Sequence, residues 1–251
     1  MLVDFNRRAD DKTNANILIL GNSGQGKSYL LKLLLTNLRE SGMRVCALDP
    51  EMEYEDLTDN LGGCFIDLMG GRYIINPLEP KTWDDAAGPE DMDAPRTFRI
   101  RSRLSQHISF LKDFFRSYKD FTDREIDVIE IMLQKLYAGW GITDQSDFDS
   151  LAPEDYPILS DLYAFMEAEY KVFDTSARQL YTAEMLRGIL LGLHSMCVGA
   201  ESKFFNGHTN ITDSSFITFG VKGLLQASRS LKDALLFNVL SFMSDELLTV
   251  G

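Results

Sequence analysis

Eight residues near the N-terminus have the types and the spacing that bind phosphate. The stretch GNSGQGKS, residues 21–28, matches the pattern G-x-x-x-x-G-K-[ST] in full. Its glycines let the backbone curl so that N–H groups converge on phosphate oxygens, and a following helix would present its positive N-terminal end there. In this pattern Lys27 reaches the β- and γ-phosphates, and the Ser28 hydroxyl binds Mg²⁺. The stretch therefore predicts a site for ATP or ADP with Mg²⁺.

The predicted nucleotide-binding residues run without a break from the first glycine into the next element. They are Gly21, Asn22, Ser23, Gly24, Gln25, Gly26, Lys27, Ser28 and Tyr29. A glycine-rich turn that binds nothing is the alternative interpretation. An apolar run before the loop and helical spacing after it argue for the nucleotide site.

Hydrolysis also needs acidic residues. P-loop enzymes hold Mg²⁺ with an aspartate at the end of another apolar strand, often followed by a glutamate that orients the attacking water. The sequence ALDPE, residues 47–51, is the one apolar strand that we expect to end in acid. Asp49 is thus the candidate metal-side acid beside Ser28, and Glu51 is the candidate catalytic acid beside Lys27. A carboxylate in such a loop is more often simply solvated.

A small set of predicted elements must position these residues. The apolar run at residues 16–20 predicts a buried parallel strand, residues 28–41 a helix that stops at Gly42, and residues 44–48 a second strand. Together they form a strand–helix–strand crossover, which implies a sheet covered on both faces. Short extended segments are expected at 64–68 and 73–75, and residues 79–95 read as a loop and a boundary.

From residue 96 to about residue 199 the pattern is mostly helical. Thr122 and Glu125 form a capping box that opens one helix, and a further helix is expected from about residue 176 to residue 193. Residues 216–219 return to strand character, and residues 232–248 form a last helix. The fold class is α/β, a nucleotide-binding half interrupted by an all-helical insertion.

Composition narrows the function classes. The 251 residues are 45% hydrophobic and carry a formal net charge of -13, so the body is a poor binder of nucleic acid or anionic membrane on its own. The three cysteines lack the paired spacing of a zinc site, and neither a signal peptide nor a membrane-spanning run is evident. These features predict a cytoplasmic protein or the cytoplasmic part of one.

Several other polar residues have simpler interpretations. Glu53 and the stretch 244–246 read as solvated positions, and the three histidines as ordinary surface or interface residues. Four arginines on the first insertion helix could meet a neighbouring subunit or DNA, although the wet face of an amphipathic helix needs such residues anyway. These four are Arg99, Arg101, Arg103 and Arg116.

Five stretches together resemble the conjugative-transfer ATPases of type IV secretion systems, the TraC-like and VirB-type class of the HerA–FtsK superfamily. They are NILILGNSGQGKSYLLK (16–32), RVCALDPEMEYEDL (44–57), YIINPLEP (73–80), LSQHISFLKDFF (104–115) and FFNGHTNI (204–211). The P-loop alone is unspecific, but its combination with the other motifs in this order is fairly specific. The resemblance runs from about residue 5 to the C-terminus.

The resemblance implies a RecA-like P-loop core whose N-terminal part is residues 1–95, a helical insertion at 96–199, and a return to the core at 200–251. It implies an ATP-hydrolysing motor, hexameric in the family, that acts with other secretion-system components at the inner face of the cell membrane, with DNA as a further partner. It also implies that the sequence stops before the strand that bears the family's Walker B aspartate and glutamate.

Three hypotheses follow from different classes. The chain is the ATP-binding domain of a secretion motor, or a nucleotide-binding remnant that does not hydrolyse ATP, or an unrelated P-loop kinase that uses Asp49 as its metal-side acid. The kinase would need a phosphoacceptor lid with several convergent arginines, and the helical insertion and downstream motifs argue against it.

Overall fold

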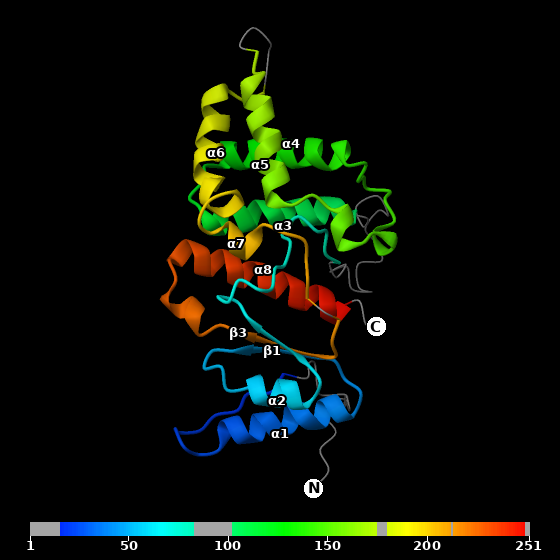
Figure 1. Ribbon diagram of the computed structural model, residues 1–251, viewed down its shortest axis with the longest axis vertical. Helices are drawn as coiled ribbons and strands as arrows, with labels where there is room; N and C mark the ends of the chain where they lie inside the picture. The colour runs from blue at the N-terminus through cyan, green and yellow to red at the C-terminus, as the bar shows by residue number, and fades with distance from the viewer. Residues whose placement is uncertain (1–15, 83–101, 175–179, 212, 249–251) are drawn as a thin grey trace, which may run out of the picture.

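A small parallel sheet lies at the centre of the computed structural model, which describes residues 16–82, 102–174, 180–211 and 213–248 (Figure 1). Its strands are β1 (Val45–Asp49), β2 (Cys64–Asp67) and β3 (Phe216–Gly220), in the order β1-β3-β2. The central strand therefore comes from the far end of the chain. Asp49 and Asp67 both stand opposite Gly220 in the register, so both outer strands end in an acid at the same edge.

Helices cover both faces of the sheet, although the predicted crossover is wrong in its first strand, since residues 16–20 form none. Helices α1 (Lys27–Glu40) and α2 (Glu55–Asn60) lie on one face, and α8 (Arg229–Leu248) lies on the other (Figure 1). Neighbouring residues of β3 show the alternation. The Thr218 hydroxyl lies 2.8 Å from that of Thr58 in α2, whereas the ring of Phe219 packs edge-on against Phe242 of α8.

The helical insertion packs on the outer side of α8 (Figure 1). Its helices are α3 (Arg103–Tyr118), α4 (Asp123–Gly139), α5 (Leu159–Lys171), α6 (Ala183–Cys197) and α7 (Ser202–Phe205). Two short 3₁₀ turns, η2 (Phe148–Ser150) and η3 (Pro153–Asp155), lie between α4 and α5, and a third, η4 (Gly223–Gln226), follows β3 outside the insertion. Phe110 of α3 stacks on Phe237 of α8 with ring centroids 5.2 Å apart. One hydrophobic core thus runs from the sheet through α8 into the insertion.

Within the insertion, the sequence predicted one helix start correctly and placed another too early. The capping box between Thr122 and Glu125 is present at the start of α4. The helix expected from residue 176 was placed too early, because α6 begins at Ala183, where the Thr182 side chain accepts the N–H of Met185 and caps it. The loop and boundary expected at 79–95 lie outside the described residues from 83 onward.

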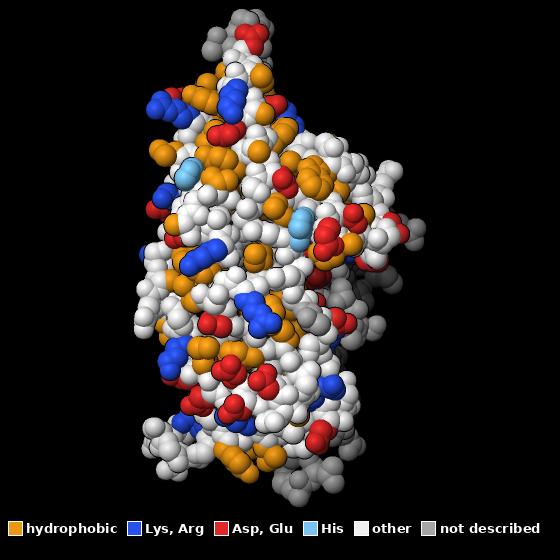
Figure 2. Space-filling model, in the orientation of Figure 1, with side chains coloured by type: hydrophobic (Ala, Val, Ile, Leu, Met, Phe, Trp, Pro, Cys, Tyr) orange, Lys and Arg blue, Asp and Glu red, His pale blue; other side chains and the backbone are white. Residues whose placement is uncertain are grey.

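The prediction of a buried strand at residues 16–20 is wrong. The segment has no regular structure, and Leu18 and Leu20 are each 81% exposed. A strand needs neighbouring backbone to pair with, and among the described residues the sheet has no strand next to this segment. The helix that follows is equally uncovered: α1 has no buried residue. Figure 2 shows hydrophobic side chains gathered at the lower end of the molecule, where Figure 1 draws α1.

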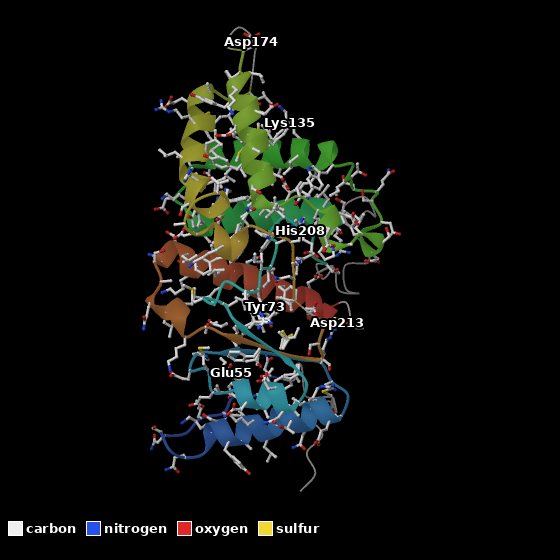
Figure 3. All side chains as sticks on the ribbon, in the orientation of Figure 1. Glu55, Tyr73, Lys135, Asp174, His208 and Asp213 are labelled. Atoms are coloured by element: carbon white, nitrogen blue, oxygen red, sulfur yellow. The ribbon has the colours of Figure 1, made fainter. Side chains whose placement is uncertain are left out.

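The short strand expected at residues 73–75 does not form either, since its one backbone hydrogen bond to residues 209–210, from the Asn210 N–H to the Ile74 carbonyl at 3.2 Å, is joined by bonds to side chains in place of a ladder. The Asn210 amide oxygen accepts the N–H of Ile74 at 2.7 Å, and the Thr209 hydroxyl accepts the N–H of Asn76 at 3.0 Å. The two stretches YIINPLEP and FFNGHTNI, which are far apart in sequence, therefore interlock. In Figure 3, Tyr73 and His208 lie in this strip between the sheet and the insertion.

The same connecting segment is also fastened to the insertion. The Asn76 side chain donates to the Pro157 carbonyl at 3.0 Å, and the Tyr137 hydroxyl donates to the Leu78 carbonyl at 2.6 Å. Both side chains are fully buried. Since a buried hydrogen bond is costly to leave unmade, this strip holds the two halves of the molecule in one arrangement.

His107 also belongs to this junction, so its interpretation as a surface or interface histidine was wrong. Its side chain is fully buried on α3, with Nε2 3.0 Å from the Pro77 carbonyl and Nδ1 accepting the N–H of Lys81 at 3.4 Å. Burial, together with the nearby Lys81 charge, lowers the pKa of His107 to about 3. The imidazole is therefore neutral at physiological pH.

Candidate nucleotide-binding site

The loop at residues 21–26 has the backbone geometry that phosphate binding requires. Gly24 and Gly26 have φ angles of 78° and 77°, in the left-handed region that side-chain-bearing residues rarely adopt. A Cβ at either position would meet nothing within 4 Å, so the space above the loop is open. The two glycines are required by the turn of the chain and not by crowding.

The start of α1 offers donors to this space. The helix begins at Lys27 with Gly26 as its N-cap, and no side chain caps its first turn. The N–H groups of that turn thus remain available to an anion, and the helix dipole favours negative charge there. The Lys27 ammonium donates to the Asn22 carbonyl at 2.7 Å, which folds the lysine over the loop. Ser28 and Tyr29 are exposed beside it. These residues fit a nucleotide phosphate with Mg²⁺.

The turn after β1 is the second part of the site. Asp49, the last residue of β1, is only 1% exposed. One of its carboxylate oxygens accepts the N–H of Glu51 at 3.2 Å, and the other accepts the N–H of Tyr54 at 2.8 Å. Asp49 therefore organises the backbone of the turn in this structure, and the prediction that it binds Mg²⁺ stays a prediction.

A lysine of α1 fixes the far end of this turn. The Lys32 ammonium donates to the Glu53 carbonyl at 2.6 Å and lies 5.3 Å from the centre of the Tyr54 ring. Met52, which lies between Asp49 and these two contacts in the chain, has a φ of 58°, the one positive φ of a non-glycine residue within the described ranges. Glu51 and Glu53 are both exposed. The turn and the phosphate-binding helix thus lie side by side, on the face of the sheet where Figure 3 labels Glu55.

Sequence reasoning missed a second acid at this edge. Asp67 ends β2 opposite Gly220, and its carboxylate accepts the N–H of Met69 at 3.0 Å. The sequence does contain a sign of this acid, because Asp67 lies near the end of the apolar run at residues 64–68 that was expected to be extended. Its place beside the site depends on the strand order, which puts Asp49 and Asp67 on either side of β3 and cannot be inferred from the sequence.

Other candidate residues have structural partners. Arg103 donates to the Pro80 carbonyl and pairs with Asp149, while Arg116 pairs with Asp113 and Asp123. These contacts favour the interpretation of an ordinary wet helix face, and Arg99 and Arg101 lie outside the described residues.

The interpretation of residues 244–246 as a solvated stretch needs correction. Glu246 forms an ion pair with Arg44 at 2.6 Å, and Asp245 accepts the N–H of Thr82 at 2.6 Å. The end of α8 is thus tied to the residues that flank the first strand and the connecting segment.

No group of three or more histidine, cysteine or acidic side chains within the described ranges is arranged to hold a metal ion. The cysteines there are free thiols. Burial raises the pKa of Cys197 to about 12 and that of Cys46 to about 11, so both thiols are protonated and unreactive at neutral pH. A metal at the site would thus need oxygen ligands such as Ser28, with water and nucleotide completing its shell.

A parallel sheet with this loop leading into a helix on one face defines a P-loop α/β protein with a helical insertion. Residues 11–184 match the family model described as "Helicase HerA, central domain". The structure of VirB4 of Thermoanaerobacter pseudethanolicus superposes with a TM-score of 0.81 and 33% identity, covering 99% of this chain and 61% of that one. The core is RecA-like, as that structure is.

Two curated proteins are similar in sequence. Protein TraC of Escherichia coli K12 is 30% identical over 103 residues, which is 41% of this chain and 10% of TraC. An uncharacterized protein of Bacillus anthracis, pXO2-09, is 26% identical over 260 residues, covering 96% of this chain and 38% of that protein. The chain belongs to the HerA family, and it is similar to TraC and VirB4.

The chain spans 10% of the length of TraC, 38% of the length of the Bacillus anthracis protein and 61% of the VirB4 chain. None of the helices among its described residues has both the length and the apolar character needed to cross a bilayer.

Proposed function

We propose that this chain is the nucleotide-binding part of a motor ATPase that drives type IV secretion or conjugative DNA transfer. It binds ATP or ADP with Mg²⁺ at residues 21–29. The observation that carries the proposal is the open loop with two left-handed glycines, set directly before an uncapped helix that starts with Lys27.

The residues have distinct roles in this proposal. Backbone N–H groups of the loop and of the first turn of α1 hold the β- and γ-phosphates. The Lys27 ammonium leaves the Asn22 carbonyl, which it contacts now, for the phosphate oxygens. Ser28 provides a hydroxyl ligand for Mg²⁺, and the ion neutralises charge on the phosphates. Glu51, exposed on the neighbouring turn, is the candidate acid for this chemistry.

The wider setting is part of the same proposal. In a secretion motor the domain works as one subunit of a homo-oligomer, a hexamer in the family, beside other secretion components at the inner face of the membrane. DNA is the transported or contacted polymer. The acidic composition, with a net charge of -13, means that other subunits or a local basic patch must provide most of any DNA contact.

Calorimetry on the purified chain with ATP or ADP and Mg²⁺ tests nucleotide binding. Lys27→Ala removes the cation and is expected to weaken binding at least about a hundredfold, a loss of roughly 3 kcal/mol. Lys171→Ala is the matched control, since Lys171 is a 72% exposed side chain on α5 that pairs with Glu167 one turn away and lies outside the predicted site. Wild-type affinity in the Lys27 variant would contradict the assignment.

The rate of ATP hydrolysis distinguishes the motor ATPase from the two alternatives, an inactive nucleotide-binding remnant and a P-loop kinase. We expect this chain alone to hydrolyse ATP at or near background, because β3 is followed by Val221 and Lys222 and not by an acid pair, and Asp49 is buried. Turnover on the order of 1 s⁻¹ or faster that Asp49→Asn abolishes would support the kinase-like function. Binding without turnover in a protein extended to the length of its relatives would support the inactive remnant.

A further inference from the structure

We propose that Asp49 and Lys32 are positioning residues: from opposite ends they fix the turn at residues 49–54 against the phosphate-binding helix, so that Glu51 faces the Mg²⁺–nucleotide. This inference rests on the proposed function. It gives Asp49 a role other than that of a metal ligand.

The first observation is the state of the Asp49 carboxylate. Both oxygens accept a backbone N–H of the turn, and the residue is 1% exposed. Mg²⁺ usually keeps several waters when it binds to a protein, and a carboxylate enclosed in this way has no room for a hydrated ion. The same two hydrogen bonds define where the chain goes after Pro50. Asp49 therefore acts on Glu51 through the backbone.

The second observation is the attachment of the turn to α1. Lys32 is one of the lysines of the phosphate-binding helix, and its ammonium reaches across to the Glu53 carbonyl while lying over the Tyr54 ring. Tyr54 is itself buried, and its carbonyl accepts the Thr58 hydroxyl at 2.7 Å. Any shift of α1 when phosphate binds at its N-terminus is thus transmitted to the turn.

The third observation is the conformation of Met52 between the two fixed ends. Its positive φ is an unfavourable conformation for a side-chain-bearing residue, and it persists where the surroundings hold it. The two attachments of the turn provide that hold, through the hydrogen bonds of Asp49 and Lys32. The Met52 side chain also lies against the sheet, because a Cβ added to Gly220 would lie 3.3 Å from Met52 Cγ. Met52 therefore packs over the end of β3, and the tip of the turn points away from the core with Glu51 exposed.

The test compares nucleotide affinity with Mg²⁺ and with EDTA, together with the melting temperature, in four variants. Asp49→Asn and Lys32→Met disturb the fixed ends, Met52→Val strains the turn while leaving both acids intact, and Glu51→Gln removes the presented acid. Met52→Gly is the matched control, since glycine adopts a positive φ without strain.

We expect Glu51→Gln to keep the wild-type melting temperature and to reduce the strengthening of ADP binding by Mg²⁺ about tenfold. Asp49→Asn, Lys32→Met and Met52→Val should lower the melting temperature by about 3 °C or more and should reduce the Mg²⁺ effect in proportion. Met52→Gly loses the packing of the Met52 side chain on β3 and so should also lower the melting temperature, but it leaves the turn unstrained and held by Asp49 and Lys32, and it should keep the wild-type Mg²⁺ effect. The reduction in Met52→Val is the decisive result, because no carboxylate has changed.

Two results would overturn the inference. One is an Mg²⁺ effect that vanishes in Asp49→Asn at an unchanged melting temperature, which makes Asp49 a metal ligand. The other is an Mg²⁺ effect that stays at the wild-type value in both Glu51→Gln and Met52→Val. A wild-type chain that binds no nucleotide would instead contradict the proposed function, and melting temperatures would then still decide whether Asp49 and Lys32 fix the turn.

Discussion

Two amphipathic helices of similar length have opposite surroundings in this molecule. Helix α3 buries eight of its 16 residues between α8 and the insertion, whereas none of the 14 residues of α1 is buried. On α1, Leu30, Leu31 and Leu33 are 44%, 37% and 48% exposed. Both helices have apolar residues at helical spacing, so the pattern alone does not decide whether a helix is covered.

The two helices also differ in what holds them to the rest of the molecule. Around α3 the rings of Phe110, Phe114 and Phe205 contact one another, and the helix is fastened to the connecting segment through His107. Around α1 the leucines are at most half-buried, and the clearest polar contact with the body is that of Lys32 with the turn at residues 49–54. The insertion is thus held by its packing. The nucleotide-binding end is held more weakly and is the part that a ligand can stabilise most.

The largest expected effect is a cavity in the insertion. Leu111 is fully buried on α3, and Leu111→Ala should reduce the free energy of unfolding by about 2–5 kcal/mol. The loss combines the transfer of the missing methyl groups with the space left behind them. Chemical denaturation monitored by circular dichroism measures it. A loss below about 1 kcal/mol would mean that the insertion core is loosely packed in solution.

The next effect in size is the stabilisation by nucleotide. ADP with Mg²⁺ at a hundredfold excess over its dissociation constant should add about 2.7 kcal/mol and raise the melting temperature by about 5–10 °C. Lys27→Ala should lose this increase, and Leu111→Ala should keep it, since the ligand site and the α3 core lie on opposite sides of the sheet (Figure 1). Equal gains in wild type and Lys27→Ala would show that the ligand binds elsewhere.

The buried histidine gives the insertion a dependence on pH. The folded-state pKa of His107, about 3, lies below its ordinary value of 6.5, so only the unfolded chain takes up the proton between these values. The contribution of His107 is therefore complete above pH 6.5 and is lost as the pH falls, by about 2 kcal/mol at pH 5. Unfolding of His107→Gln at pH 7.5 and pH 5 should show a smaller difference than wild type. An equal difference would place the effect on other groups.

The smallest effect is expected where the leucines are exposed. Leu20→Ala should change the free energy of unfolding by less than about 0.5 kcal/mol, because the side chain is 81% exposed before the substitution. It is the matched partner of Leu111→Ala, measured under the same conditions. A loss of 2 kcal/mol or more would show that residues 16–20 are covered in solution, and sedimentation at several concentrations would tell whether a second copy covers them.

The sequence by itself determined the features that depend on neighbours in the chain. The P-loop spacing, the capping box of Thr122 with Glu125, the strand at residues 216–219 and the last helix are local patterns, and each forms where it was expected except for shifts of a few residues at the ends. The loop at residues 21–28 also depends only on local geometry, since its two left-handed positions are glycines.

Tertiary structure decided the features that depend on distant residues. The strand order β1-β3-β2 brings Gly220 between Asp49 and Asp67 and places Met52 against it, while the hydrogen bonds of Asp49 and Lys32 hold the turn. In the same way, burial of His107 depends on Pro77 and Lys81, and exposure of Leu20 depends on the lack of a paired segment among the described residues. Periodicity states which side of an element can be buried, but burial itself requires a second surface, and that surface comes from elsewhere in the chain.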